Sequence, residues 1–499
     1  MIQPRVDWLH RWAEYTPGAR VLRDHARDRA WTYAEADGRA AALAAHLAAD
    51  LGVGPGDRVA VLSRNRAETV LLYFACVKLG AILVPLNFRL TPRELDALVA
   101  DCAPALLLVG QDEQAAADAL AAPSGRRLPL DAVTPFLMQD VTPPAAPRPA
   151  PADLDLPVMI LYTAGTTGLP KGAVITHRML LWNAINTQLR LDITSADHTQ
   201  SYAPFFHTGG WHVLLTPFLH HGASTTLLES FEPELVLELM AAERTTLLFG
   251  VPTMMRMLSE CADFAAADLS ACRYAIVGGA PMPLPLIDTW HAKGVMVRQG
   301  YGMTEVGPNC FSLHQDDAVR KRGSIGQPNF YIEARVVGED GADCAVDQPG
   351  ELWLRSEVVT PGYWNKPAET AAAKSGDWFR TGDVVRRDAE GFHYVVDRKK
   401  NMYISGGENV YPAEVEHVLQ SHPAVREAAV IGVPDARWGE VGKAFVSLHE
   451  GHTFDLSTLQ AHCGGKLARY KIPKHVHVLP DLPLNQAGKI DRLRLHELG

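Results

Sequence analysis

A segment rich in glycine and threonine, YTAGTTGLPKG at residues 162–172, has the composition of a phosphate-binding loop. Its small and hydroxyl-bearing residues include Thr163, Gly165, Thr166, Thr167 and Gly168. These leave room for backbone N–H groups and hydroxyls to close around phosphate oxygens, and Lys171 adds a mobile positive charge. A Walker A loop has Gly before its lysine and Ser or Thr after it, whereas Pro170 and Gly172 stand here. The segment predicts a phosphate loop of another kind, with a plain Gly-rich turn as the alternative.

A second polar segment, QGYGMTE at residues 299–305, follows a predicted strand. Its two glycines would let the backbone approach a planar ligand, against which Tyr301 can stack. Glu305 offers a hard oxygen ligand for Mg²⁺. Taken alone, the segment is equally consistent with a strand-to-loop turn that carries a solvated glutamate.

Three shorter segments place charged residues in polar turns. Asp383 follows Thr381-Gly382, and its carboxylate can accept hydrogen bonds from two vicinal ribose hydroxyls. The turn DRKKNM at residues 397–402 is basic, and PLNQAGKID at 483–491 carries a Gly-Lys pair near the C-terminus. Alone, each of these reads as a solvated surface turn.

In this order, the segments closely resemble the motifs of the acyl-adenylate-forming (AMP-binding) superfamily of acyl-CoA synthetases, nonribosomal adenylation domains and beetle luciferases. The pattern is closest to the fatty acyl-CoA synthetases and spans nearly the whole chain, including GELWLRS at 350–356, PGYWNKPAET at 361–370 and SGGENVYPAEVE at 405–416. The resemblance implies a large N-terminal domain over residues 1–399, with the adenylate site and acyl pocket. It also implies a C-terminal lid over residues 400–499 that rotates between half-reactions.

The resemblance assigns roles to individual residues. It implies catalysis by Lys489, Lys171 and Glu305, where Lys489 neutralises charge that develops on the α-phosphate and carboxylate. It implies metal binding by Thr163 and Glu305, and a hinge at Lys400. The implied nucleotide-binding residues are Thr163, Gly165, Thr166, Thr167, Gly168, Gly279, Ala280, Gly300, Tyr301, Gly302, Thr304, Asp383 and Arg398.

The charge-free run FFHTGGW at residues 205–211 supplies aromatic bulk and small residues for an acyl pocket, with a packed helix start as the alternative. The expected pocket residues are Phe206, His207, Trp211, Gly250, Val251 and Pro252. By resemblance, His207 replaces the Asp that binds the α-amino group in amino-acid-activating members. Trp211 falls where some long-chain members have a tunnel-gating tryptophan. His207, His212, His220 and His221 do not have zinc-site spacing.

The implied reaction begins when a carboxylate attacks the α-phosphate of Mg·ATP to give acyl-AMP and pyrophosphate. The thiol of coenzyme A then displaces AMP. ATP, Mg²⁺ and coenzyme A are the expected cofactors and substrates, and a medium- or long-chain fatty acid is the expected acid. An aryl- or short-chain acid-CoA ligase and a non-catalytic adenylate-binding module are the alternatives.

The elements that position these residues follow from the pattern of apolar and capping residues. Thr32 and Thr91 each precede a Glu by three residues, which predicts two capped helices. Short apolar strands at 58–62, 81–85 and 105–109 alternate with helices, as in a parallel sheet covered on both faces. From about residue 400 the predicted helices and strands follow a short, mixed pattern, which indicates a small α+β domain. The expected fold class is α/β, with a large N-terminal domain of mixed and parallel sheets flanked by helices and a small mobile α+β C-terminal domain.

Composition supports a globular enzyme acting on small molecules. The 499 residues are 47% hydrophobic and 21% charged, and the net charge of −10 without a basic stripe argues against nucleic acid as a partner. Seven cysteines without CxxC spacing indicate neither zinc nor disulfides. No signal-peptide core or integral membrane segment is predicted, so a cytoplasmic location is expected. The oligomeric state is left open, with a homodimer among the alternatives.

Overall fold

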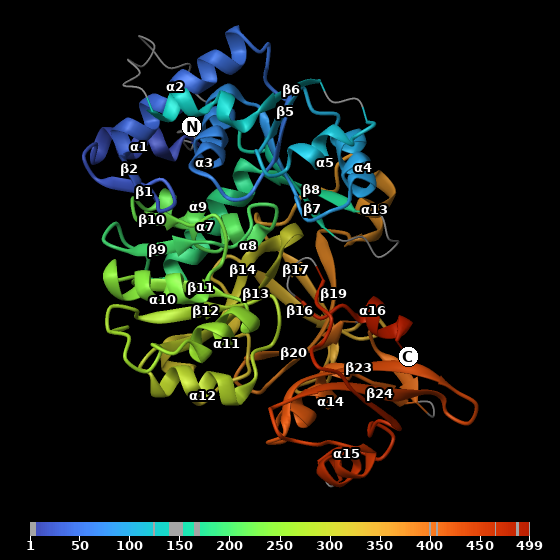
Figure 1. Cartoon of the computed structure of the whole chain (residues 1–499). Helices are drawn as coiled ribbons and strands as arrows, with labels where there is room; N and C mark the ends of the chain where they lie inside the picture. Colours follow the sequence, from blue (N-terminus) through green and yellow to red (C-terminus); the bar gives the residue numbers. More distant parts are fainter. Residues whose placement is uncertain are drawn as a thin grey trace.

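The computed structural model describes residues 6–122, 125–138, 153–163, 170–398, 401–405, 408–464, 466–485 and 489–498. Its sheets are flanked by helices, and the lid forms a separate small lobe (Figure 1). Within the described ranges, we find no helix that is both long and apolar enough to span a bilayer.

A six-stranded sheet in the order β6-β5-β3-β4-β7-β8 carries the N-terminal part of the site. Its strands are β3 (Arg58–Leu62), β4 (Ile82–Leu86), β5 (Leu106–Val109), β6 (Arg126–Pro129), β7 (Pro157–Thr163) and β8 (Lys171–Thr176). All neighbours pair in parallel except β7 and β8, which are antiparallel. The sheet is therefore mixed, and the antiparallel pair brackets the predicted phosphate loop.

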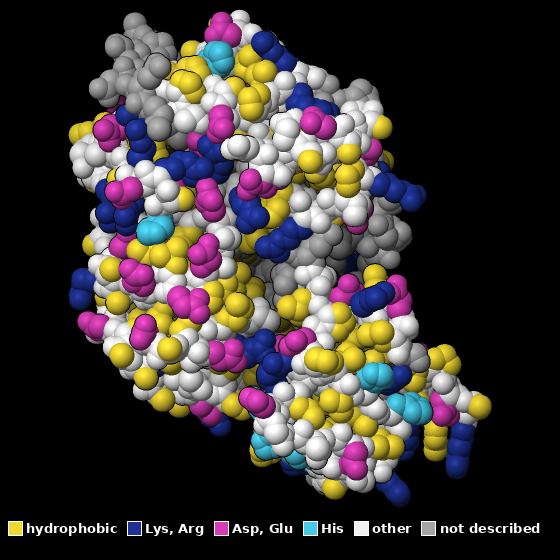
Figure 2. All heavy atoms as spheres, in the orientation of Figure 1, with side chains coloured by type: hydrophobic (Ala, Val, Ile, Leu, Met, Phe, Trp, Pro, Cys, Tyr) yellow, Lys and Arg dark blue, Asp and Glu magenta, His cyan; other side chains and the backbone are white. Residues whose placement is uncertain are grey.

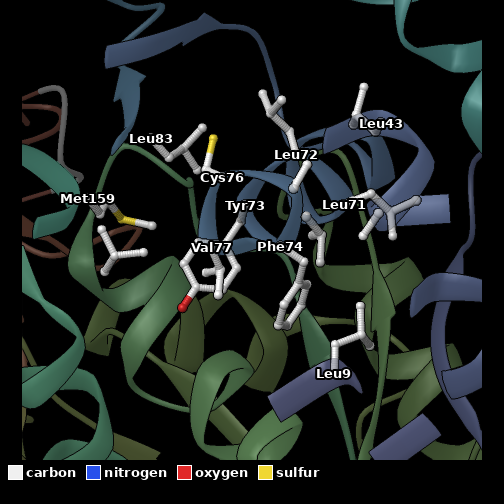
Figure 3. Close-up of a cluster of buried hydrophobic side chains, with 14 of the residues drawn as sticks. Leu9, Leu43, Leu71, Leu72, Tyr73, Phe74, Cys76, Val77, Leu83 and Met159 are labelled. Atoms are coloured by element: carbon white, nitrogen blue, oxygen red, sulfur yellow. The ribbon is translucent and has the colours of Figure 1, made fainter. Parts of the chain in front are cut away.

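Helices α1 (Trp8–Tyr15), α2 (Tyr33–Ala49), α3 (Ala67–Leu79) and α4 (Pro92–Cys102) accompany this sheet. The capping boxes at Thr32 and Thr91 are confirmed, because each Thr hydroxyl accepts from the Glu N–H three residues later while the Glu carboxylate reaches back. Every residue of α3 is buried, and Figure 3 shows its Leu71, Tyr73 and Phe74 packed in the largest core cluster. An all-round apolar helix is expected at the centre of a domain.

The strands after the phosphate loop divide between two sheets. Strand β10 (Ser224–Leu227) pairs with β9 (His198–Ser201) and β1 (Arg20–Asp24), beside β2 (Arg29–Thr32). A separate sheet contains β11 (Leu247–Gly250), β12 (Tyr274–Val277), β13 (Met296–Met303), β14 (Gly307–Ser312) and β15 (Gln327–Pro328). The helices of this region are α7 (His177–Leu191), α8 (Thr208–His212), α9 (Leu215–His220), α10 (Pro233–Ala242), α11 (Pro252–Glu260) and α12 (Leu284–Ala292).

A third layer leads to the lid. It contains β16 (Glu333–Val337), β17 (Gly350–Arg355), β18 (Lys374–Ser375), β19 (Trp378–Arg387) and β20 (His393–Arg398), with α13 (Pro367–Ala372). The lid sheet contains β21 (Tyr403–Ser405), β22 (Glu408–Val410), β23 (Val425–Asp435), β24 (Gly439–Leu448) and β25 (His475–Val478). Its helices are α14 (Pro412–Gln420), α15 (Leu456–Cys463) and α16 (Arg492–Glu497).

The lid meets the large domain across a hollow in the surface (Figure 2). An ion pair crosses between them, from Arg256 Nη2 on α11 to Glu427 Oε1 on β23 at 3.0 Å. The predicted boundary after residue 399 falls where the chain leaves β20, but residues 399 and 400 lie outside the described ranges. That boundary stays a prediction.

Candidate active site

The antiparallel pair of β7 and β8 brings Thr163 and Lys171 opposite each other at the base of the predicted phosphate loop. Successive side chains of a strand point to opposite faces of the sheet, so the pairing of β7 with β8 sets the face on which each of these two side chains lies. Gly165, Thr166, Thr167 and Gly168 lie outside the described residues.

Glu305 lies beside this base, on the short 3₁₀ turn η2 (Thr304–Val306) that follows β13. Its Oε1 accepts hydrogen bonds from the Tyr363 hydroxyl at 2.9 Å and the Thr163 hydroxyl at 3.3 Å. Burial raises the pKa of Glu305, whereas the bond from Tyr363 opposes that rise. A buried carboxylate next to a threonine hydroxyl is an oxygen donor set that fits Mg²⁺ held together with substrate phosphates.

Tyr363 is a site residue that we did not single out from the sequence. Besides its bond to Glu305, its ring centroid lies 5.3 Å from Lys171 Nζ, within the range of a cation–π contact. The residue is tied to β8 by a bridge between Ala173 and Tyr363. It falls within the run PGYWNKPAET, which we used only as family context, so no separate signal marked it.

Asp383 lies on β19 and is 4% exposed. Its Oδ2 accepts a hydrogen bond from the Tyr301 hydroxyl at 2.6 Å, and its Oδ1 pairs with Arg398 Nε at 2.9 Å. A carboxylate offers about four acceptor positions, so ribose hydroxyls can still bind. The predicted residues Asp383, Arg398 and Tyr301 are thus brought together, with Tyr301 donating through its hydroxyl.

Lys489 reaches this cluster from the lid. A Cβ added at Gly279, where φ is 81°, would lie 3.6 Å from Lys489 Cε and 3.5 Å from Val251 Cγ1. Burial and the charge of Arg398 lower the pKa of Lys489, whereas Asp383 opposes that shift. The lysine backbone is held by Asn485, whose Oδ1 accepts its N–H at 3.1 Å. The lid therefore delivers a cation to the nucleotide-facing residues.

Three other residues predicted to bind the nucleotide lie on β13 and on the turn that follows it. Gly300 and Gly302 belong to β13, and Thr304 begins η2. A Cβ at Gly302 would lie 2.3 Å from the Gly307 carbonyl oxygen, so no larger residue fits there. Ala280 follows Gly279 in the loop after β12.

The predicted acyl residues gather at the end of β11. Gly250 ends this strand, Val251 caps α11 and Pro252 begins it. His207 precedes α8, and burial, followed by the charges of Lys489 and Arg89, lowers its pKa to about 4. Its imidazole is therefore neutral at pH 7.

The aromatic rings of this region were only partly anticipated. The Phe206 and His207 rings lie 4.5 Å apart. Phe249, which we did not predict, is partly exposed, and a Cβ at Gly209 would lie 3.2 Å from its ring. The glycine therefore lets the Phe249 ring lie against the α8 backbone.

The placement of Trp211 in the pocket needs correction. Its side chain is completely buried, its ring stacks on Phe205 at 4.4 Å, and its Nε1 donates to the Phe205 carbonyl. It belongs to the main core cluster rather than to a pocket wall. The sequence misled because a tryptophan beside two glycines in a charge-free run suits a core as well as a tunnel.

Two further expectations concern metals and the hinge. In the described part of the chain, no three His, Cys, Asp or Glu side chains are grouped as the ligands of a structural zinc site would be. Burial lowers the pKa of His212 and of His220 to about 3 each. Lys400, the predicted hinge, lies outside the described residues.

Comparison with known proteins agrees with this geometry. The chain matches the AMP-binding enzyme family over residues 9–364 and the AMP-binding enzyme C-terminal domain over residues 414–489. It is 41% identical to feruloyl-CoA synthase of Amycolatopsis sp, over 97% of this chain and 96% of that protein. Indoleacetate–CoA ligase of Aromatoleum aromaticum is 37% identical (99% and 97% covered). The long-chain-fatty-acid–CoA ligase FadD13 of Mycobacterium tuberculosis is 35% identical (99% and 98%).

Solved structures extend the comparison. The o-succinylbenzoate CoA synthetase of Bacillus subtilis with its acyl-adenylate intermediate superposes with a TM-score of 0.85 at 33% identity, covering 99% of this chain and 98% of that one. The same enzyme with ATP and magnesium ion gives 0.84 at 33% identity, covering 98% and 99%. The chain therefore belongs to the AMP-binding enzyme family, as an AMP-forming acyl-CoA synthetase that works through an acyl-AMP intermediate.

Proposed function

We propose that the protein activates a carboxylic acid with ATP and Mg²⁺ and transfers it to coenzyme A, with the residues described above in specific roles. The observation that carries this proposal is the placement of Lys489 from the lid beside Gly279, Arg398 and Asp383. A cation there can neutralise charge that develops as the carboxylate attacks the α-phosphate.

The remaining roles follow from the chemistry of each side chain. Glu305 and Thr163 would hold Mg²⁺, which neutralises phosphate charge when bound. Lys171 would pair with phosphate oxygens, and Asp383 would bind the ribose hydroxyls while Arg398 and Tyr301 fix its carboxylate. After acyl-AMP forms, the lid would rotate about Lys400 and admit the thiol.

For the acid, we propose an aromatic carboxylate rather than the fatty acid that the sequence motifs first suggested. Phe249 has a partly exposed ring at the end of β11, against Gly209 of α8, and aromatic rings favour aromatic partners. Trp211, the basis for a fatty-acyl tunnel, is in the core. Relatives named for feruloyl-CoA and indoleacetate support this substrate class, whereas the fatty-acid relative keeps a long-chain acid as the second candidate.

The test is a panel of acids in a pyrophosphate-release assay. We expect ferulate-type arylacrylates and arylacetates to outcompete dodecanoate, malonate and amino acids. Burying the second ionised group of malonate unpaired would cost several kcal/mol. Phe249→Leu should reduce the preference for aromatic over alkyl acids, while Met257→Leu, an exposed change on α11, serves as the control. Preferential use of dodecanoate would refute the aromatic proposal and leave the reaction type intact.

A further inference from the structure

Arg492 is the first residue of α16 and lies three positions after Lys489. Its Nη2 pairs with Glu416 Oε1 on α14 at 2.7 Å, and its Nη1 donates to the Val430 carbonyl on β23. The Val430 N–H in turn donates to the same Glu416 oxygen at 2.7 Å. Arg492 is therefore clamped to a helix and a strand of the lid at once.

The loop of residues 483–491, which carries Lys489, is followed directly by Arg492. Two backbone hydrogen bonds join the start of this loop to its end. The Asn485 N–H donates to the Lys489 carbonyl at 2.6 Å, and the Asp491 N–H donates to the Pro483 carbonyl at 2.8 Å. The Arg492 side chain then ties the residues after Lys489 to the body of the lid. Figure 1 shows α16, which begins at Arg492, on the side of the lid towards β19.

The N-terminal turn of α14 contacts the segment before the predicted hinge. Asp397 Oδ2 accepts the Ala413 N–H at 2.8 Å, at the first turn of the helix. Asp397 Oδ1 accepts from the Arg398 N–H at 2.6 Å and from Asn401 Nδ2 at 3.0 Å. One short helix thus joins the residue before Arg398 to the residue that anchors the Lys489 loop.

We propose that Glu416 and Arg492 are positioning residues whose ion pair holds Lys489 in place opposite Arg398 and Asp383 while acyl-AMP forms. The inference rests on the proposed role of Lys489 in adenylation. An arginine that bonds two elements through its two Nη atoms restricts position more than a single contact does. The Arg492 and Glu416 side chains are only partly exposed, at 24% and 12%. Loss of the pair would let the loop shift without removing the lysine.

The test measures both half-reactions for Glu416→Gln, Arg492→Gln and the double variant. Pyrophosphate release with acid and ATP should fall about 10-fold or more, since misplacing a reacting group by about 1 Å can cost about 10²-fold. Coenzyme A consumption with preformed acyl-AMP should be preserved. The double variant should lose no more than Arg492→Gln, because that variant already removes both the ion pair and the contact with the Val430 carbonyl.

Glu414→Gln is the matched control. Glu414 lies on the same helix and pairs with Lys471 Nζ at 2.7 Å, away from the Lys489 loop. Its variant should keep pyrophosphate release. Arg492→Lys, which retains the charge but not the double contact, should recover part of the rate lost in Arg492→Gln, and this comparison decides the question if Glu416→Gln does not fold.

Two results would overturn the inference: a Glu416→Gln rate equal to that of Glu414→Gln, or an equal loss in both half-reactions. Lys489→Ala separates this failure from failure of the proposed function. If Lys489→Ala keeps full pyrophosphate release, the proposed adenylation role is wrong. If Lys489→Ala loses it while Glu416→Gln does not, only the positioning role is wrong.

Discussion

At the residue scale, Asp383 has the most constrained side chain of the nucleotide site. Asp383→Ala should raise the apparent KM for ATP at least 10-fold, because charge-assisted hydrogen bonds to the ribose, each about 1.5–3 kcal/mol, are lost. The change also leaves Arg398 and the Tyr301 hydroxyl without this partner. The measurement is pyrophosphate release against ATP concentration, with the exposed Asp377→Ala as the control. An unchanged KM would contradict ribose binding by Asp383.

Tyr363 provides a second test at this scale. Tyr363→Phe removes the hydroxyl that bonds Glu305 but keeps the ring near Lys171, whereas Tyr363→Leu removes both contacts. We expect Tyr363→Phe to raise the Mg²⁺ concentration for half-maximal pyrophosphate release about 10-fold or more, since a hydrogen bond to a charged group contributes about 1.5–3 kcal/mol. Tyr363→Leu should also weaken phosphate binding, measured as the Kd for ATP without metal. Equal behaviour of the two variants would argue against a separate role for the ring.

At the element scale, Glu243 joins three strands and the end of α10. It accepts hydrogen bonds from His198 at 2.8 Å and from Thr226, and it pairs with Arg23. Burial alone would raise the pKa of Glu243, but these hydrogen bonds lower it from 4.5 to about 2. The folded pKa lies below the ordinary value, so the stabilisation is complete above pH 4.5 and is lost as pH falls toward 2.

We therefore expect Glu243→Gln to lower the free energy of unfolding by about 3 kcal/mol at pH 7, since one pKa unit corresponds to about 1.4 kcal/mol. Urea unfolding at pH 7, 5 and 4 measures the difference from the native protein. The difference should narrow at pH 4. The exposed Glu260→Gln is the control and should show no such trend. A constant difference across this range would mean that the charge of Glu243 is not what stabilises the sheet.

At the scale of the whole molecule, the Arg256–Glu427 ion pair spans the large domain and the lid. Rotation of the lid would have to break it, so Glu427→Gln should slow pyrophosphate release while sparing thioester formation. The effect should be modest, about 2- to 5-fold, because partly exposed pairs contribute about 0.2–1 kcal/mol. Added salt should reduce the difference between the native protein and the variant.

Arg256 also provides the control for that experiment. Within α11 its Nε lies 4.0 Å from Glu260, so Glu260→Gln removes a pair of the same arginine that does not cross the domains. Pyrophosphate release should be unaffected. If both variants behave alike, the cross-domain contact does not favour the adenylate-forming arrangement.

Much of this architecture could be predicted from the sequence because its signals are local. A Thr followed three residues later by Glu stabilises a helix start wherever the helix packs, and Gly80 with φ of 79° ends α3 for the same local reason. The pairing of the strands was harder to predict from the sequence. β10 and β11 lie close in the chain, yet they belong to different sheets, since pairing depends on which apolar faces meet in space.

Residue types at short spacing were enough to identify the family and the α/β class, and they predict which residues contact the nucleotide. The partners of those residues depend on tertiary packing. It bonded Tyr301 to Asp383, placed Tyr363 between Glu305 and Lys171, buried Trp211 in the core and brought Lys489 from the lid to Gly279. Contacts between residues far apart in the chain arise from packing, and packing responds to the shape of the whole core rather than to any local pattern.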